Sequence, residues 1–329
     1  MGIPVTVIIV TLNRPDCVRR CLDCLFDQSP HPEQIIVVDA SPGEETRRVV
    51  DEFSSVVYLR NDNGYGRMTA SRNIGLKVAT GEIIAFLDDD AFAHPGWLEN
   101  LRATYTDRTV GAVGGRALNN QPGEEVLGVN GIGRLKPNGL LTGYFAADPG
   151  KVIEVDHIIG CNMSYRSDVL AALGGLREDY TGTEVREETD ICLRVKALGY
   201  KTLFNPLACV DHIGAPQAKG QRFDARYAYY AQRNHLVLLI RNFGPGASIV
   251  WRYLGTSFVA TLFEFVKKVA AAFARLGANM GGTVAGIVAG LLLISKTGRD
   301  PVRHDSEGQV ISRSLGESFI EEQPVHEPQ

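Results

Sequence analysis

Three short apolar runs stand out in the first hundred residues of the sequence. They cover residues 5–12, 33–40 and 82–89, and each has the length and β-branched content of a buried strand. Segments with helical spacing lie between them, and such alternation of strands and helices predicts a parallel α/β sheet. Residues 56–60 have the composition of one further strand.

Helix signals separate and follow these strands. Proline at a first helical position, apolar spacing and a closing glycine predict helices over 15–28, over 69–79, from Pro95 onward and over 185–198. A later strand is predicted at 157–166. Two short strands are predicted at 201–205 and 207–212.

Two regions lack this regular alternation. Residues 118–155 are rich in Gly, Asn and Pro without a sustained period, so we expect loops or an excursion over the sheet that offer a binding surface. Beyond Gly246 there are five basic residues and one acid as far as Lys296, among aromatic and aliphatic residues, which indicates a surface-seeking amphipathic helix. The uncharged stretch 276–295 is compatible with a membrane span, although its asparagine and glycines favour a monotopic or protein-packed hairpin.

The organisation that follows is one large domain with an appendage. We expect a domain over 1–243, which divides into two halves at about 1–117 and about 118–243. We further expect a helical extension over 244–296 that is able to associate with a membrane, and a disordered tail over 297–329.

Composition narrows the class of protein. Hydrophobic residues make up 44% and charged residues 22%, as in ordinary globular proteins. The net charge of -4 and a pI near 6.0 argue against a nucleic-acid binder that relies on overall basicity. The N-terminal residues lack the features of a signal peptide, so we expect a cytoplasmic protein whose six cysteines are thiols.

Three adjacent carboxylates follow one of the buried runs. In a parallel α/β sheet, ligands bind beyond the carboxyl ends of the strands, where Asp88, Asp89 and Asp90 are placed. Adjacent anions raise one another's pKa unless a cation intervenes, and oxygen ligands suit Mg²⁺ or Mn²⁺, which would also take oxygens from a diphosphate. The alternative is a turn whose acids cap the next helix, but a triplet that closes a buried strand favours the metal site.

Other strand ends carry polar residues as well. Thr11 and Asn13 end the first strand and Asp39 ends the second. A carboxylate at position 39 can accept from a pyrimidine ring N–H or a ribose hydroxyl, or it can cap a loop. Arg72 lies on a predicted helix, where a guanidinium can meet a phosphate or remain solvated.

The order of these motifs resembles family 2 glycosyltransferases of GT-A fold, in particular the rhamnosyltransferase-like branch. The pieces that match are VTVIIVTLNR, IIVVDAS, NGYGRMTASRNIGLKVATGEIIAFLDDDA, IIGCNMSYRSDVLAALGG, EETDICLRVKALGYK, VDHIG and YYAQRNHLVLLIRN. They span about residues 3–243, and the ordered set is more specific than any one of them.

The resemblance implies roles for the polar residues. It implies a metal site of Asp88, Asp90 and His212, with Asp89 beside it. It implies a nucleotide and donor pocket that includes Thr11, Asn13, Asp39 and Arg72, together with Asp88 and Asp89. The fold it implies is a Rossmann-like, mostly parallel sheet flanked by helices.

The resemblance also implies the reaction. It is an inverting, hexosyltransferase-type transfer from a nucleoside diphosphate sugar, with Mn²⁺ or Mg²⁺, to a hydroxyl of a glycan or lipid-linked acceptor in polysaccharide or cell-envelope synthesis. The position of Glu188 implies the general base, where the family generally has Asp, with Glu187 and Asp190 as alternatives. A plain acidic first helical turn would also account for these three residues. The basic, apolar segment beyond Gly246 would hold such an enzyme on the cytoplasmic membrane face.

Two other functions compete with this interpretation. Cys17, Cys21 and Cys24 have the C-x₃-C-x₂-C spacing of radical-SAM iron–sulfur enzymes, but they fall on one face of a predicted helix, whereas a cluster needs an irregular loop. A binding module that has kept the scaffold and lost turnover is the second competitor. A degraded site would more often lose its acids, and here carboxylates remain at each position.

Overall fold

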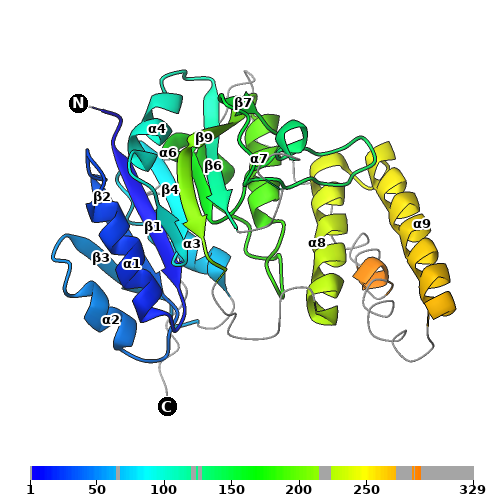
Figure 1. Cartoon of the computed structure of the whole chain (residues 1–329), viewed down its shortest axis with the longest axis horizontal. Helices are drawn as coiled ribbons and strands as arrows, with labels where there is room; N and C mark the ends of the chain where they lie inside the picture. Colours follow the sequence, from blue (N-terminus) through cyan, green and yellow to red (C-terminus); the bar gives the residue numbers. More distant parts are fainter. Residues whose placement is uncertain are drawn as a thin grey trace, which may run out of the picture.

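A mixed sheet forms the centre of the molecule (Figure 1). The computed structural model describes residues 2–63, 67–119, 124, 128–214, 224–271, 284 and 286–289. Within these residues nine strands join, in the spatial order β3-β2-β1-β4-β8-β6-β9-β5, and β7 pairs with β9. The strands are β1 (Val5–Thr11), β2 (Gln34–Asp39), β3 (Val56–Arg60), β4 (Ile83–Asp88), β5 (Ala91–Ala93), β6 (Val110–Leu118), β7 (Ile153–Glu154), β8 (Asn162–Arg166) and β9 (Lys201–His212).

The N-terminal half of the sheet is parallel, as the sequence predicts. β3, β2, β1 and β4 run side by side in the same direction. Thr11 pairs with Asp39, and Val10 pairs with Asp88, so the polar ends of three strands meet at one edge of the sheet. This edge is where ligands bind in open α/β sheets.

The other half of the sheet is mixed. β8 runs antiparallel to both β4 and β6, and β5 and β7 run antiparallel to β9, whereas β6 and β9 are parallel. The parallel arrangement predicted from the apolar runs therefore applies to the first four strands in the spatial order.

Helices cover both faces of the sheet. The helices are α1 (Pro15–Phe26), α2 (Glu45–Val50), α3 (Met68–Leu76), α4 (Trp97–Thr104), the 3₁₀ turn η1 (Val129–Gly131), α6 (Ser167–Leu173), α7 (Glu187–Ala197), α8 (Ala225–Phe243) and α9 (Ser248–Ala271). α1, α2 and α4 pack on one face, and α3, α6 and α7 pack on the other. Successive strand residues supply the two cores: Val7 and Ile9 face the first set of helices, and Ile8 and Val10 face the second.

Two strand predictions differ from the structure. The strand expected at 157–166 is shorter, because β8 begins only at Asn162. Residues 201–205 and 207–212 form the single strand β9 instead of two short strands. Pro206 separates the two predicted segments, and proline cannot donate a ladder hydrogen bond because it lacks an N–H. The pairing of β6 with β9 shifts register at this point, from Gly115 opposite Asn205 to Ala117 opposite Val210, so Pro206 lies in the irregular part of the ladder. Beyond the irregularity, β9 continues to His212 at the site edge of the sheet.

This irregular pairing leaves no room for a side chain at Gly115. A Cβ built there would lie 1.8 Å from the carbonyl oxygen of Ala208. We expect Gly115→Ala to lower the free energy of unfolding by at least about 2 kcal/mol, because backbone atoms must move to relieve the overlap. Chemical denaturation measures this, with Gly246→Ala as control because a Cβ at Gly246 meets nothing within 4 Å. Equal stability of the two variants would contradict this account of the irregular pairing between β6 and β9.

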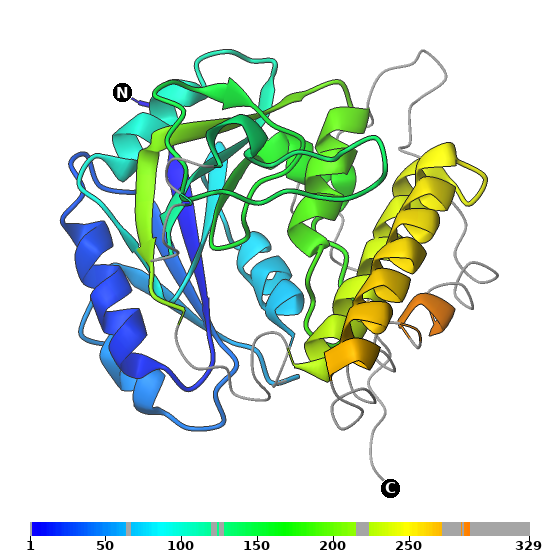
Figure 2. The same cartoon turned by 45° about the vertical axis from the view of Figure 1, so that its right-hand side comes forward.

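A pair of long helices stands beside the domain that contains the sheet (Figure 2). α8 packs on α9 through a small cluster that includes Leu239, Val250 and Tyr253, and it meets α7 through Leu193 and Val237. α9 is the helix predicted beyond Gly246. No helix in the described part of the chain is both long and apolar enough to cross a membrane. The tail 297–329, and the stretch 276–295 apart from 284 and 286–289, lie outside the described residues.

Candidate active site

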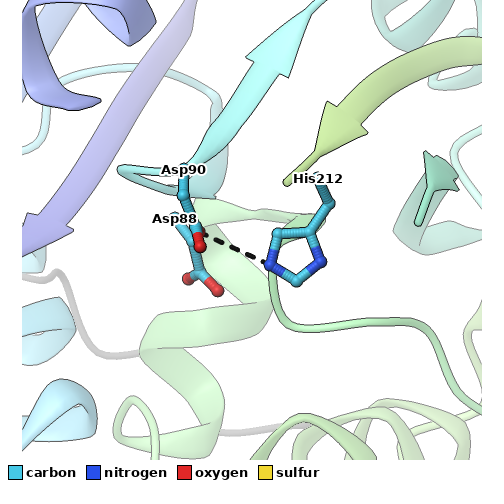
Figure 3. Close-up of side chains that lie close together, drawn as sticks. All are labelled: Asp88, Asp90 and His212. Carbon is cyan, nitrogen blue, oxygen red and sulfur yellow. Dashed lines mark ion pairs between the residues drawn. The ribbon is translucent and has the colours of Figure 1, made fainter. Parts of the chain in front are cut away.

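Asp88, Asp90 and His212 come together at the end of the sheet (Figure 3). Asp88 ends β4, Asp90 lies in the turn to β5, and His212 ends β9, whose pairing with β5 sets Ala91 opposite His212. One ligand atom from each of the three residues lies within 4.8 Å of the others, and Asp90 Oδ1 is 3.4 Å from His212 Nε2. The structure thus brings together the three residues for which the resemblance implies a metal site.

The donor set fits a divalent cation. Two carboxylates and one imidazole supply hard or intermediate ligands, which suit Mn²⁺ and Mg²⁺, and imidazole favours Mn²⁺ of the two. Asp90 and His212 are buried, whereas the Asp88 side chain keeps about a quarter of its surface exposed. A cation held here would therefore face solvent, and ligands entering from solvent, on the Asp88 side.

The middle aspartate of the triplet turns inward. Thr11 Oγ1 donates to Asp89 Oδ2 at 2.6 Å, and Arg14 Nη1 lies 3.2 Å from Asp89 Oδ1 and 3.3 Å from Asp90 Oδ2. Burial raises the pKa of Asp89 to about 7, although Arg14 and Thr11 favour its ionised form. Asp89 thus fixes the end of β1 against the turn that carries Asp90.

A cavity of about 160 Å³ adjoins this turn. The end of β1, the start of α3 and the end of β4 line it, and its polar lining includes Thr11, Arg14, Arg67, Ser71 and Asp88. Arg14 is partly exposed and Arg67 is exposed, so two cations face the opening next to the carboxylates. A cavity with cations at its mouth and a metal site at its wall suits a phosphorylated ligand.

Asp39 has the contacts of a loop-capping acid. It has no exposed surface, its Oδ1 accepts from both the backbone N–H and the hydroxyl of Ser41, and its Oδ2 accepts from Tyr58 Oη at 3.0 Å. The N–H of Asn13, which is exposed and has a φ of 56°, donates to Ser41 Oγ at 2.7 Å. Ser41 therefore ties the loop after β1 to the loop after β2.

Arg72 is buried, although the resemblance implies that it lies near the donor diphosphate. Its Nη2 donates to Asp88 Oδ1 at 3.0 Å and to the carbonyl oxygen of Gly160 at 3.1 Å, and its Nη1 donates to Glu187 Oε1. The side chain has no exposed surface. One guanidinium therefore joins the metal site to the first turn of α7.

The first turn of α7 carries the three candidate bases. Glu188 is partly exposed, and its Oε2 accepts from the backbone N–H of Arg186 at 3.1 Å. Glu187 is buried, and its Oε2 has no hydrogen-bond partner among the described residues. Burial raises the pKa of both glutamates. The positive charge of Arg72 limits the increase for Glu187, and that of Arg186 limits it for Glu188.

The backbone before α7 adopts an uncommon conformation. Glu184 and Arg186 both have positive φ, 54° and 85°, a region that residues other than glycine rarely adopt. Glu184 is buried and accepts from the N–H of Thr69 at 2.9 Å, which ties this loop to the start of α3. The loop that leads into α7 and Glu188 is thus held by α3, the helix that carries Arg72.

Asp190, the third candidate, is an internal residue. Its Oδ1 accepts from Arg177, Tyr180 and Asn242, and only 1% of the residue is exposed. These contacts join α7 to α8 and to the segment before α7. They give Asp190 a structural position, and among the three acids Glu188 is the one that solvent reaches.

The three N-terminal cysteines lie on the regular helix α1. Cys21 is buried, with its Sγ 3.6 Å from the carbonyl oxygen of Ala91, and Cys17 and Cys24 are half-buried. The iron–sulfur alternative needs them on an irregular loop, so this alternative is not supported. All six cysteines of the chain are free thiols, as expected.

Sequence reasoning missed Arg14, Ser41 and Arg67. Arg14 had a readable signal, since it is a basic residue directly after the first strand, at the edge where the three aspartates gather. Ser41 is a small polar residue in the loop after the second strand, and such a residue carries no specific signal in the sequence. Arg67 precedes α3 without any local pattern that marks it.

Comparison with known proteins decides the family. The model of glycosyl transferase family 2 matches residues 6–174, slightly more than half of the chain. The chain belongs to glycosyl transferase family 2. It is a glycosyltransferase, and Asp88, Asp90 and the cavity beside them lie within the matched region.

Relatives of this family 2 glycosyltransferase act on different molecules. Glucosyl-dolichyl phosphate glucuronosyltransferase of Haloferax volcanii is 28% identical over 225 residues, which cover 64% of this chain and 69% of the relative. Pre-mycofactocin glycosyltransferase of Mycobacterium tuberculosis is 29% identical over 232 residues, which cover 69% of this chain and 46% of the relative.

Solved structures share the fold. The mannosyltransferase PcManGT from Pyrobaculum calidifontis, in complex with GDP-Man and Mn²⁺, superposes with a TM-score of 0.54 at 18% identity, covering 90% of this chain and 88% of the other. S. aureus TarS 1-349 superposes with a TM-score of 0.57 at 13% identity, covering 88% and 80%. The family 2 chain therefore has the GT-A fold, as predicted.

Proposed function

We propose that this glycosyltransferase is a metal-dependent, inverting enzyme. It moves a sugar from a nucleoside diphosphate sugar to a hydroxyl of a glycan or lipid-linked acceptor, in the synthesis of polysaccharide or cell-envelope glycans. The observation that carries the proposal is the contact of Arg72 with both Asp88 and Glu187, because it sets the candidate base helix next to the metal site.

Asp88, Asp90 and His212 hold the metal, Mn²⁺ or Mg²⁺, in this proposal. A cation bound there supplies positive charge to the departing diphosphate. Arg14 and Arg67 face the cavity and contribute further positive charge to the phosphates. Thr11, Asn13 and Asp39, with Ser41, shape the nucleotide side of the cavity through the two linked loops.

Glu188 is the general base in this proposal. It takes the proton of the acceptor hydroxyl while that oxygen attacks the anomeric carbon, opposite the leaving nucleoside diphosphate. Glu188 replaces the Asp that the family generally has, and one oxygen of its longer side chain bonds to the N–H of Arg186. That bond fixes the carboxylate in position. Glu187 and Asp190 then have structural roles. Glu187 pairs with Arg72, and Asp190 accepts a hydrogen bond from Asn242 of α8.

The likeness to known enzymes supports the class of acceptor. The Haloferax volcanii relative is named for glucosyl-dolichyl phosphate, a sugar on a lipid carrier. The ordered motifs between residues 3 and 243 favour the rhamnosyltransferase-like branch within the family. We assign residues 1–117 to the donor and to the two metal carboxylates, 118–243 to the acceptor side, which also supplies His212, and 244–296 to a helical extension.

Inversion is open to a direct test without knowledge of the acceptor. In the absence of acceptor, water takes its place, and slow hydrolysis of an α-linked donor such as UDP-glucose should first release the β-anomer. Time-resolved ¹H NMR follows the anomeric protons before mutarotation, over a panel of α-linked donors with Mn²⁺. First release of the α-anomer by the wild-type enzyme would contradict the inverting mechanism, and Glu188→Gln serves as the inactive control.

The extension supports peripheral association with the cytoplasmic membrane face. Trp251, Phe258 and Val259 are each more than 60% exposed, and they lie on one face of α9, since residues seven and eight apart are neighbours around a helix. Large exposed apolar side chains gathered on one face are typical of helices that lie in the membrane interface.

We therefore expect the full-length protein to bind liposomes that contain anionic lipid. Trp251→Ser with Phe258→Ser should lower the bound fraction at least about fivefold, because burial of each side chain contributes roughly 1.5–3 kcal/mol. Sedimentation with liposomes measures it. Leu207→Ser is the matched control, since Leu207 is equally exposed but lies on β9. Wild-type protein that stays in the supernatant would refute the association.

A further inference from the structure

Arg72 is one of the largest fully buried side chains of the molecule, and its surroundings explain how a charge is tolerated there. A guanidinium without water needs carboxylates and hydrogen-bond acceptors around it, because an unpaired buried charge is strongly destabilising. Asp88, Glu187 and the carbonyl oxygen of Gly160 meet this need at the two terminal nitrogens, whereas Nε has no hydrogen-bond partner among the described residues. They come from β4, from the start of α7 and from the segment that precedes β8, which are far apart in the sequence.

These contacts leave little opportunity for a phosphate. Arg72 has no exposed surface, so a phosphate would have to displace Asp88 or Glu187 to reach it. Arg14 and Arg67, in contrast, line the cavity and are reached by solvent. The donor phosphates have two better placed guanidinium groups to meet.

We propose that Arg72 is a positioning residue that holds the metal carboxylate Asp88 and the base helix α7 in one fixed arrangement, and that it does not bind donor phosphate. Its planar guanidinium bonds Asp88 Oδ1 through Nη2 and Glu187 through Nη1. A metal ligand whose orientation is fixed by such an outer partner binds its metal more tightly. This inference rests on the metal-dependent transfer proposed above.

The bond between Arg72 and Asp88 affects metal binding even before any nucleotide binds. A ligand that is already oriented loses less freedom when the cation binds, so the affinity for Mn²⁺ alone depends on Arg72. Removal of the arginine also changes the charge near the metal site, which would by itself favour a cation. The test therefore has to remove the bond to Asp88 while it keeps the local charge constant.

Two variants meet this requirement. Arg72→Lys keeps the charge but replaces the planar fork with a single ammonium that cannot bond both carboxylates in the same way. The double variant Arg72→Met with Glu187→Gln removes one positive and one negative charge together. Arg166→Lys is the matched control, because Arg166 is also buried and bonds the backbone carbonyl oxygens of Tyr105 and Val110, outside the site.

The measurement is titration of the full-length protein with Mn²⁺ without nucleotide, with free Mn²⁺ followed by electron paramagnetic resonance. We expect both Arg72 variants to raise the Kd for Mn²⁺ about tenfold or more and Arg166→Lys to change it less than about twofold. If the double variant does not fold, Arg72→Lys alone decides.

Wild-type Mn²⁺ affinity in the Arg72 variants would overturn the proposal. Wild-type Mn²⁺ affinity combined with loss of nucleoside diphosphate binding would make Arg72 a phosphate ligand instead. Because the titration contains neither donor nor acceptor, its outcome is independent of whether the proposed transfer reaction is correct.

Discussion

Asp90→Asn should abolish metal-dependent glycosyl transfer, with a loss of turnover of about 10³-fold or more. Asp90 lies between His212 and Arg14 and supplies one of the two carboxylates of the candidate metal site. Asparagine keeps the shape of the side chain but removes its charge. Several kilocalories per mole of stabilisation of the departing diphosphate then disappear, which corresponds to the expected loss in rate.

Initial rates across a Mn²⁺ titration measure this effect, together with Mn²⁺ binding to the free enzyme. Asp211→Asn is the matched control, because Asp211 directly precedes His212 but pairs with His94 at the surface. Its turnover should stay within about twofold of wild type. Metal-dependent turnover at the wild-type rate in Asp90→Asn would show that the three residues do not form the catalytic metal site.

Glu188→Gln should lower turnover by about 10²–10⁴-fold and leave the affinity for the nucleoside diphosphate unchanged. Glutamine cannot take the proton of the acceptor hydroxyl, but it can still accept from the N–H of Arg186 and so preserve the start of α7. Steady-state turnover and calorimetric binding of the nucleotide measure the two effects separately. Glu188→Asp, which restores the acid usual in the family, should recover part of the activity.

The pH dependence gives an independent check on the base. Burial raises the pKa of Glu188 above its ordinary value, and the charge of Arg186 limits the increase. The base must be ionised to act, so kcat/KM should fall as the pH decreases through this raised pKa, and the acidic limb should lie above pH 4.5.

Equal loss of nucleotide binding in Asp90→Asn and Glu188→Gln would contradict the separate roles of metal site and base.

Local sequence pattern predicted the parallel half of the fold and one edge of the site. The apolar runs that became β1, β2 and β4 are long and rich in β-branched residues, so strands were the natural prediction. The rule that ligands bind at the carboxyl ends of parallel strands then placed Thr11 and Asp88 together. No pattern of this kind predicted that β8 would run antiparallel between β4 and β6.

The remaining parts of the site depend on contacts between distant segments. His212 reaches Asp90 because β9 pairs with β5, and only the resemblance to the family indicated this position. Arg72 and Glu187 are 115 residues apart, so nothing in the local sequence reveals that they form an ion pair. Residues 201–212 form one strand because a register shift lets the pairing continue past Pro206, and local sequence does not reveal such a shift.

The most direct test of the central claim is the melting temperature of the purified protein with UDP, dTDP, GDP and CDP, each with and without Mn²⁺. A ligand that binds only the folded protein raises the melting temperature, so the measurement reports binding without any knowledge of the acceptor. We expect one nucleotide to stabilise the wild-type protein only when Mn²⁺ is present, and we expect Asp90→Asn to lose that stabilisation. Absence of any shift with all four nucleotides, or an equal shift without metal, would contradict a site in which the aspartates hold a metal and the metal holds the diphosphate.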